Sequence, residues 1–258
     1  MKALAQTAPI NRVPEVTVDF WLIKLMAVTM GETAADYLAV NLGLGLTVTS
    51  IIMTAILVVV VAIQFAQKRY VPASYWAAVV LISIVGTLIT DNLVDNFGVP
   101  LEATTIGFSI ALAVTFAVWF AFERTLSIHT IYTTQREAFY WLAILFTFAL
   151  GTAAGDLIAE TFDFGYLTTA FLFMAVICVM AVAYALAGLN SIVAFWLAYI
   201  FTRPLGASLG DLLSQPVEYG GLGFGTVYTS LLFLGLIVAI VIYMTLSQSS
   251  REPTQATP

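Results

Sequence analysis

Four aspartates recur in this sequence at a fixed distance behind a tryptophan, and this spacing makes them the first candidates for chemistry. Each closes the pattern F/Y-W-x9-G-x4-D, and the four are Asp36, Asp91, Asp156 and Asp211. All four lie in long apolar stretches. If such a stretch crosses a membrane, an ionisable side chain costs roughly 2.5–3.5 kcal/mol there and by default indicates a functional site. Carboxylates in such a place bind cations, either a metal ion held by oxygen ligands or a proton.

Two further charged residues fall inside similar stretches. Glu32 stands four residues before Asp36, so the two carboxylates share one helix face and form the densest acidic pair in the chain. Arg203 is followed by Pro204, which removes a backbone donor. A buried guanidinium needs an acidic partner, and we expect Arg203 to pair with one of the four repeated aspartates. Such a pair would make the repeats inequivalent, so we favour one asymmetric site over a symmetric ring.

A glycine precedes each repeated aspartate by five residues, at Gly31, Gly86, Gly151 and Gly206. Two interpretations stay open. The glycines, together with Pro204, can break the helix and expose carbonyl oxygens to a cation, as in discontinuous transporter helices. Alternatively they allow close helix packing, while the aspartates merely face the outer headgroups. Nearby hydroxyls are either cation ligands or donors to their own helix carbonyls, at Thr29, Thr33, Thr87, Thr90, Thr147, Thr152 and Thr202.

A tryptophan opens each repeat, at Trp21, Trp76, Trp141 and Trp196. Fifteen residues separate each tryptophan from its aspartate, which corresponds to ~22 Å of helix. We therefore expect the tryptophans in the aromatic belt at the cytoplasmic interface and the aspartates in the outer third of the membrane. Lys24, three residues after the first tryptophan, is interpreted as a further interface anchor whose ammonium reaches the headgroups.

The elements that must position these residues are transmembrane helices. Of 258 residues, 61% are hydrophobic and only 9% are charged, against roughly 25% charged residues in soluble domains. The mean hydropathy is +0.99. Apolar stretches of ~20 residues predict an all-α integral membrane protein with eight transmembrane helices, near residues 17–40, 45–67, 75–96, 103–122, 138–159, 166–187, 190–213 and 224–246. The even-numbered helices contain no charged residue and are expected to face lipid or support the others.

Each repeat contains two of these helices, so the four repeats enter the membrane from the same side and their first helices run parallel. The repeated aspartates are 55 residues apart within each half of the chain, and the two halves are offset by 120 residues. The predicted organisation is an N-terminal cytoplasmic segment (1–16), four repeats (17–68, 69–124, 125–188 with a leading cytoplasmic loop, and 189–247) and a disordered cytoplasmic tail (248–258).

Basic residues predict the orientation, because Lys and Arg in short loops stay on the cytoplasmic side. Seven of the nine lie on one side of the predicted helices, at Lys2, Arg12, Lys68, Arg69, Arg124, Arg136 and Arg251. Both termini are therefore expected in the cytoplasm. The opposite loops are acidic, and the net charge of −6 argues against a nucleic-acid partner. One cysteine, Cys178, and one histidine, His129, leave no disulfide framework and no His/Cys zinc site, and no cofactor is expected.

The repeat also resembles a known family. The segments PEVTVDFWLIK and GETAAD are similar to the unit of bacterial membrane-anchored proteins named for a repeat of unknown function, F-W-x-x-K followed by G-E-x-x-x-D. The resemblance covers essentially the whole chain and implies a bacterial inner-membrane location, but no activity. Repeats two to four depart from the fullest form: Lys24 is replaced by Val79, Ile144 and Tyr199, and Glu32 by Thr87, Thr152 and Ala207.

These observations favour a small transporter or exporter of a cation, either a divalent metal or one coupled to protons, with its site where the odd-numbered helices converge. The expected partners are the lipid bilayer and a cation or small molecule. A structural or interaction protein without flux stays open as an alternative. An intramembrane aspartyl hydrolase needs only two catalytic carboxylates and leaves four matched ones unexplained, so we expect no enzyme.

Overall fold

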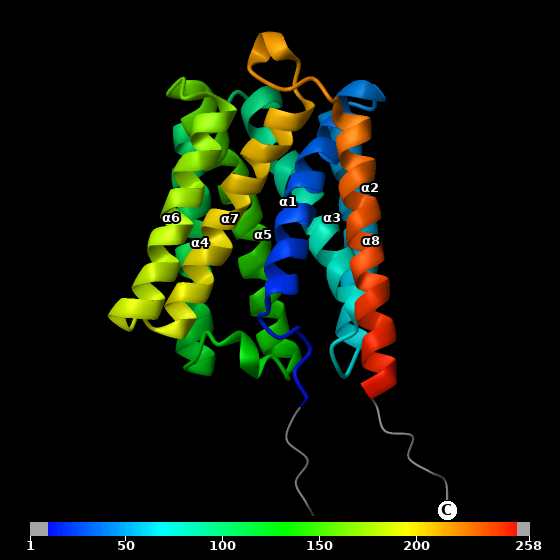
Figure 1. The fold of residues 1–258 in the computed structure, drawn as a ribbon, viewed down its shortest axis with the longest axis vertical. Coiled ribbons are helices and arrows are strands. Elements are labelled where there is room, and N and C mark those ends of the chain that lie inside the picture. The colour runs from blue at the N-terminus through cyan, green and yellow to red at the C-terminus, as the bar shows by residue number, and fades with distance from the viewer. Residues whose placement is uncertain (1–9, 252–258) are drawn as a thin grey trace, which may run out of the picture.

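The part of the chain that the structure describes is a bundle of eight long helices. The computed structural model describes residues 10–251, with side chains for residues 10–247, and this part of the chain contains no β-strand. Expectations for residues 1–9 and 252–258 lie outside the described residues. The helices, labelled in Figure 1, are α1 (Val18–Asp36), α2 (Leu46–Ala66), α3 (Pro72–Asp91), α4 (Leu101–Glu123), α5 (Thr134–Asp156), α6 (Gly165–Ala187), α7 (Ser191–Ser214) and α8 (Thr226–Arg251).

Seven of these helices, α2 to α8, are long and apolar enough to cross a membrane. The helix outside this group is α1, whose 19 residues include four charged side chains. The structure therefore confirms an all-helical, membrane-type protein. The predicted tail is wrong at its start, because α8 continues to Arg251 and residues 248–251 are helical.

Helix starts follow local sequence signals. The side chains of Thr17 and Thr133 accept hydrogen bonds from the backbone N–H three residues later, and Asn190 caps α7 in the same manner. Pro72 occupies the first turn of α3, where its missing N–H leaves no intrahelical bond unmade. These signals begin the four odd-numbered helices between three and seven residues before the repeated tryptophan.

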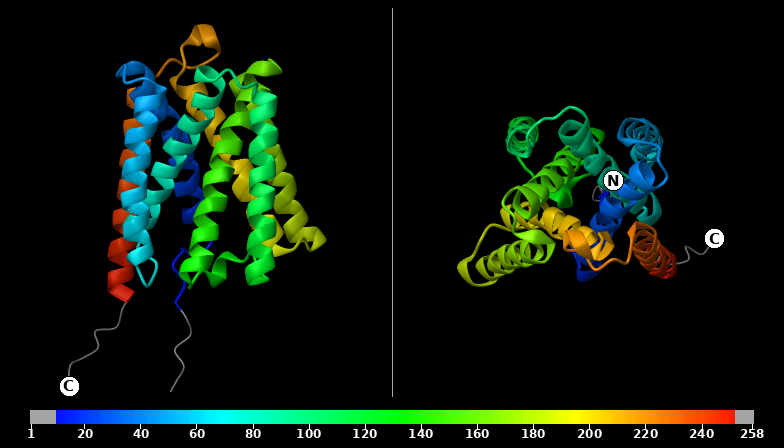
Figure 2. Two further views of the ribbon diagram at one scale, coloured as in Figure 1. Left: turned by 180° about the vertical axis from the view of Figure 1, so that it is seen from behind. Right: turned by 90° about the horizontal axis from the view of Figure 1, so that it is seen from above.

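The odd-numbered helices form a closed central ring. Each packs on two others, in the order α1, α3, α5, α7 and back to α1. The even-numbered helices lie outside this ring, as Figure 2 shows from above, and most of their surface is exposed as expected. Each even-numbered helix packs on the first helix of the following repeat, and α8 closes the circle by packing on α1. No repeat therefore buries its own apolar faces alone.

The repeated glycines lie against the neighbouring helices of the ring. A Cβ atom at Gly31 would lie 2.0 Å from the Ser83 hydroxyl oxygen. Each glycine abuts the residue that stands three positions before the glycine of the next repeat: Gly31 meets Ser83, Gly86 meets Phe148, Gly151 meets Arg203 and Gly206 meets Val28. The geometry supports the close-packing interpretation. The helix-breaking interpretation is wrong, because α-helix continues through all four glycines and through Pro204.

The helices do change geometry after the repeated aspartate. In α1, α3 and α5 the aspartate is followed directly by a π-helical turn, at Tyr37–Asn41, Asn92–Asn96 and Leu157–Thr161. Wide turns of this kind are rare and often accompany functional sites. In α7 no such turn follows Asp211, and the helix ends at Ser214 before a short 3-10 helix, Val217–Tyr219. The fourth repeat is thus the different one.

Candidate functional site

The structure brings all four repeated aspartates and Glu32 to one cavity. The cavity has a volume of about 180 Å³ and lies where the odd-numbered helices end, at the top in Figure 1. Two further acids, Asp95 and Glu160, and the polar side chains of Tyr166 and Gln215 also line it. We call this space the acidic cavity. Its carboxylates come from the first three repeats in greater number than from the fourth.

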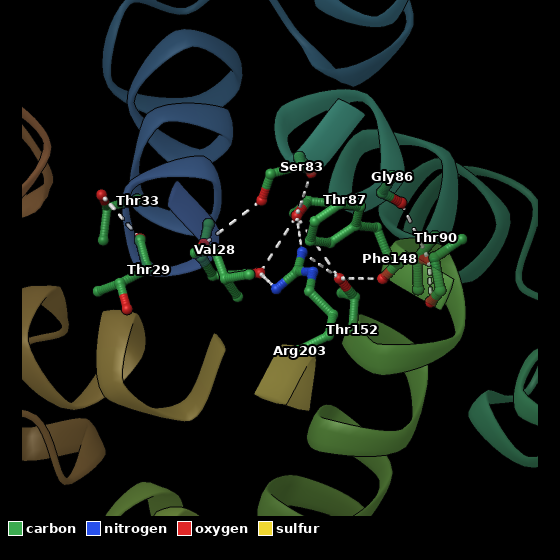
Figure 3. A network of polar contacts seen from close by, with 12 residues as sticks. Val28, Thr29, Thr33, Ser83, Gly86, Thr87, Thr90, Phe148, Thr152 and Arg203 are labelled. Atoms are coloured by element: carbon green, nitrogen blue, oxygen red, sulfur yellow. Dashed lines mark hydrogen bonds and ion pairs between the residues drawn. The ribbon is translucent and has the colours of Figure 1, made fainter. Parts of the chain in front are cut away.

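The inner boundary of the acidic cavity is an ion pair. Arg203 is fully buried, and its Nη1 donates to Oε2 of Glu32 at 2.9 Å. Its Nη2 donates to the hydroxyl oxygens of Thr87, at 2.5 Å, and Thr152, at 2.7 Å. Thr87 in turn donates to Glu32 at 3.1 Å. Figure 3 shows how the guanidinium lies between side chains from α1, α3 and α5.

The predicted partner of Arg203 is wrong: the pair forms with Glu32 and not with a repeated aspartate. Arg203 stands three residues before its glycine, whereas the aspartates stand five residues after theirs. At 1.5 Å per residue, these positions differ by ~12 Å along the axis of the ring. Glu32 directly follows its glycine and lies ~6 Å from the level of Arg203, within reach of a long side chain.

The positions that hold Arg203 are equivalent in the repeat. Glu32, Thr87 and Thr152 are each the residue after the repeated glycine, and the fourth such residue is Ala207. Threonine replaces Glu32 in the second and third repeats, and the two threonine hydroxyls accept hydrogen bonds from Arg203. The alanine belongs to α7, the helix that contributes the guanidinium. The site is asymmetric, as expected, although its asymmetry comes from Glu32 and Arg203.

The aspartates are spread around the acidic cavity. Among the described side chains, no three His, Cys, Asp or Glu residues come close enough to hold a metal ion together. Asp36 accepts a hydrogen bond of 3.3 Å from Gln215, and Asp211 is buried while Asp36, Asp91 and Asp156 are half-buried. The polar walls and volume of the cavity suit several water molecules. The arrangement fits a cation that keeps part of its hydration shell.

Lys24 does not reach the headgroups. It is fully buried, its ammonium donates to the Tyr199 backbone oxygen at 2.5 Å, and the same nitrogen lies 4.1 Å from the centre of the Tyr199 ring. The interface-anchor prediction is wrong because α1 is a ring helix, and this face of α1 points at α7. Tyr199 is the residue that replaces Lys24 in the fourth repeat.

The repeated tryptophans form part of an aromatic layer inside the ring. Trp76, Trp141 and Trp196 are buried, while Trp21 is half-buried. Trp141 packs on Tyr75, and Trp196 packs on Tyr140. The hydroxyl oxygens of Tyr75 and Tyr140 lie 2.5 Å apart. The predicted belt position is therefore wrong for the three buried tryptophans, because these rings fill the space between parallel helices. This aromatic layer, Lys24 and Arg203 fill the axis of the ring below the acidic cavity.

A further buried acid, Glu137, was not among the predicted site residues. Arg12 donates to it at 2.7 Å and Gln64 at 3.1 Å. The backbone of residues 11–12 also bonds to Tyr70 and Ile131 in two loops. The segment before α1 is thus fastened across the end of the ring next to the aromatic layer. The available signal was a polar residue at the end of each of two apolar stretches, Gln64 and Glu137.

One protein family matches this chain. Its description is Repeat of Unknown Function (DUF347), and it matches four times, at residues 20–70, 74–125, 139–189 and 194–250. The chain belongs to the DUF347 family. The resemblance to a four-repeat family is thereby confirmed. Each DUF347 match contains one odd-numbered helix and the even-numbered helix that follows it. Neither the curated proteins nor the solved structures contain a significant match.

Proposed function

We propose that this DUF347 protein crosses the membrane eight times and transports a cation along the axis of its ring, without catalysing a chemical reaction. The observation that carries this proposal is the acidic cavity, where four repeated carboxylates and Glu32 meet above the buried Arg203. Intramembrane ionisable residues commonly belong to ion pathways. A ring of parallel repeats around such a site resembles the general plan of transporters, although inverted repeats are commoner.

The eighth crossing is α1. Its position in the ring is equivalent to that of α3, α5 and α7. Its charges explain its lower hydropathy, and two of them, Lys24 and Glu32, are buried inside the bundle rather than exposed to lipid. The loops with Lys68, Arg69 and Arg124, and the first turn of α5 with Arg136, lie at the end opposite the acidic cavity. The positive-inside rule then assigns that end, and both termini, to the cytoplasmic side of a bacterial inner membrane.

The ion pair gives the route its gate. Carboxylates concentrate cations at the open acidic cavity, while the guanidinium of Arg203 repels them from the axis below. A cation or proton bound to Glu32 removes the negative charge that holds Arg203. The guanidinium then loses its counter-charge and α7 loses its ion pair with α1. Movement of α7 against α1 would open the route through the aromatic layer.

Flux in liposomes tests this proposal. The reconstituted protein is assayed with Mn²⁺, Zn²⁺ and Mg²⁺, and a pH-sensitive dye reports coupled protons. We expect saturable flux that Asp91→Asn lowers by at least tenfold. Glu102→Gln is the matched control, because Glu102 is an exposed acid at the same end and does not line the acidic cavity. Absence of flux for every cation and of proton movement would contradict transport.

The structural alternative makes the opposite prediction. It is supported by the filled axis below the acidic cavity, since a protein without flux needs no open route. In that case replacing all four repeated aspartates by asparagine leaves the protein folded and the cell phenotype intact. Loss of the phenotype with normal folding would favour the transport proposal.

A further inference from the structure

A second cavity opens on the side of the bundle, toward the end opposite the acidic cavity. It has a volume of about 660 Å³ and lies between α1, α6 and α7, next to the loop at residues 126–129. Figure 1 shows α6 and α7 diverging from α1 toward this end. Its walls are mostly aliphatic and aromatic, with Leu25, Ile177 and Phe195 among them. We call it the side groove, and the proposed transport route does not use it.

Three polar residues of the side groove lie at the end that is nearest the loops and farthest from the acidic cavity. Ser127, His129 and Ser191 line it at the level of the loops. From there the groove extends along α7 to Thr202 and Leu205, in the middle of that helix. The Thr202 hydroxyl donates to its own helix carbonyl, at Ala198, and is thus already bonded. The groove therefore has a polar mouth and an apolar body.

This layout identifies the occupant. The apolar body lies on α6 and α7, which are both long and apolar enough to span a membrane, so the material that reaches it is hydrocarbon. No Asp or Glu is among the groove residues. The same end of the bundle has basic residues in its loops, Lys68, Arg69 and Arg124, the last of them two residues before the groove loop, and such a surface attracts anionic headgroups. We propose that the side groove binds one acyl chain of an anionic phospholipid, with the headgroup at Ser127, His129 and Ser191.

Tryptophan fluorescence can test the proposal directly. Trp21 lines the side groove, whereas Trp76, Trp119, Trp141 and Trp196 are buried elsewhere in the bundle. The protein is reconstituted in vesicles that contain either phosphatidylglycerol or phosphatidylcholine with brominated acyl chains, at equal mole fractions. The quenching of Trp21 is the difference between the wild type and Trp21→Phe. At low mole fraction we expect brominated phosphatidylglycerol to quench Trp21 at least threefold more strongly than brominated phosphatidylcholine.

Two variants separate the site from ordinary lipid contact. Ala198→Phe places a ring in the side groove and should abolish the excess quenching. Ala113→Phe adds the same ring on an exposed position of α4 outside the groove and should leave it unchanged. If Ala198→Phe fails to fold, His129→Glu at the exposed mouth serves instead, since it should abolish the preference for phosphatidylglycerol.

The opposing outcomes are equally defined. Equal quenching by the two lipids, or a preference that survives in both Ala198→Phe and His129→Glu, would overturn the proposal. A loss of quenching by both lipids in Ala198→Phe without any preference would also overturn it, because the groove would then hold a chain without selecting a headgroup. Binding is measured without flux, so the result is independent of the transport proposal.

Discussion

Replacing Glu32 by glutamine is the sharpest test of the site, because this carboxylate is the anion that Arg203 contacts. The Arg203 side chain is fully buried and that of Glu32 is 7% exposed, so solvent ions screen the pair little. Removing one partner of a buried pair typically destabilises a protein by about 3–5 kcal/mol, since an uncompensated charge stays behind. Thr87 and Thr152 still accept hydrogen bonds from the guanidinium. We therefore expect a loss of about 3 kcal/mol, at the lower end of that range.

A double variant shows whether the loss comes from the ion pair. Replacing both charges of a buried pair is often close to neutral, so Glu32→Gln/Arg203→Met should recover most of the stability that Glu32→Gln loses. The coupling energy between the two changes should then exceed about 1 kcal/mol, as for residues in direct contact. Glu102→Gln, an exposed acid outside the acidic cavity, should stay within about 0.5 kcal/mol of the wild type.

Thermal unfolding in detergent micelles measures these differences. For a chain of this size, 1 kcal/mol shifts the midpoint by roughly 2–4 °C, so Glu32→Gln should unfold roughly 6–12 °C below the wild type. A midpoint equal to that of the wild type would refute the reasoning. So would single-variant losses that simply add in the double variant, because Arg203 would then not depend on Glu32.

Three further predictions concern the ring. Gly86→Ala should lower the free energy of unfolding by about 1–3 kcal/mol, because a Cβ atom there would lie 2.8 Å from that of Phe148. The control Gly107→Ala, with no atom within 4 Å of the added carbon, should instead raise the free energy of unfolding by up to about 1 kcal/mol. Thermal unfolding measures both variants. Glu137→Gln leaves Arg12 without its acid and should expose the segment before α1 to limited proteolysis; an unchanged cleavage pattern would contradict the fastening of that segment. Lys24→Met should keep the free energy of unfolding within about 1 kcal/mol of the wild type, since the cost of burying an ammonium offsets most of what its carbonyl and ring contacts contribute. A loss above about 3 kcal/mol would argue against that balance.

The sequence by itself predicts the membrane-type helices, the four repeats and the residues that share a level in the bundle. These follow from composition and spacing, because helices of equal pitch place residues at equal offsets in the repeat at equal heights. The common height of Asp36, Asp91, Asp156 and Asp211 is therefore readable without a structure. So is the peripheral position of the even-numbered helices, whose predicted apolar stretches contain no charged residue.

Only the tertiary structure decided which residues of neighbouring helices are in contact. The choice of Glu32 over an aspartate as the partner of Arg203 depends on which level of a neighbouring helix a long side chain reaches. The burial of Lys24 and of three tryptophans depends on how each helix is rotated about its own axis. The packing of every even-numbered helix on the next repeat depends on the closure of the ring by α8 on α1. Spacing along one helix specifies heights and faces, but the distance and rotation between helices result from the packing of all eight together.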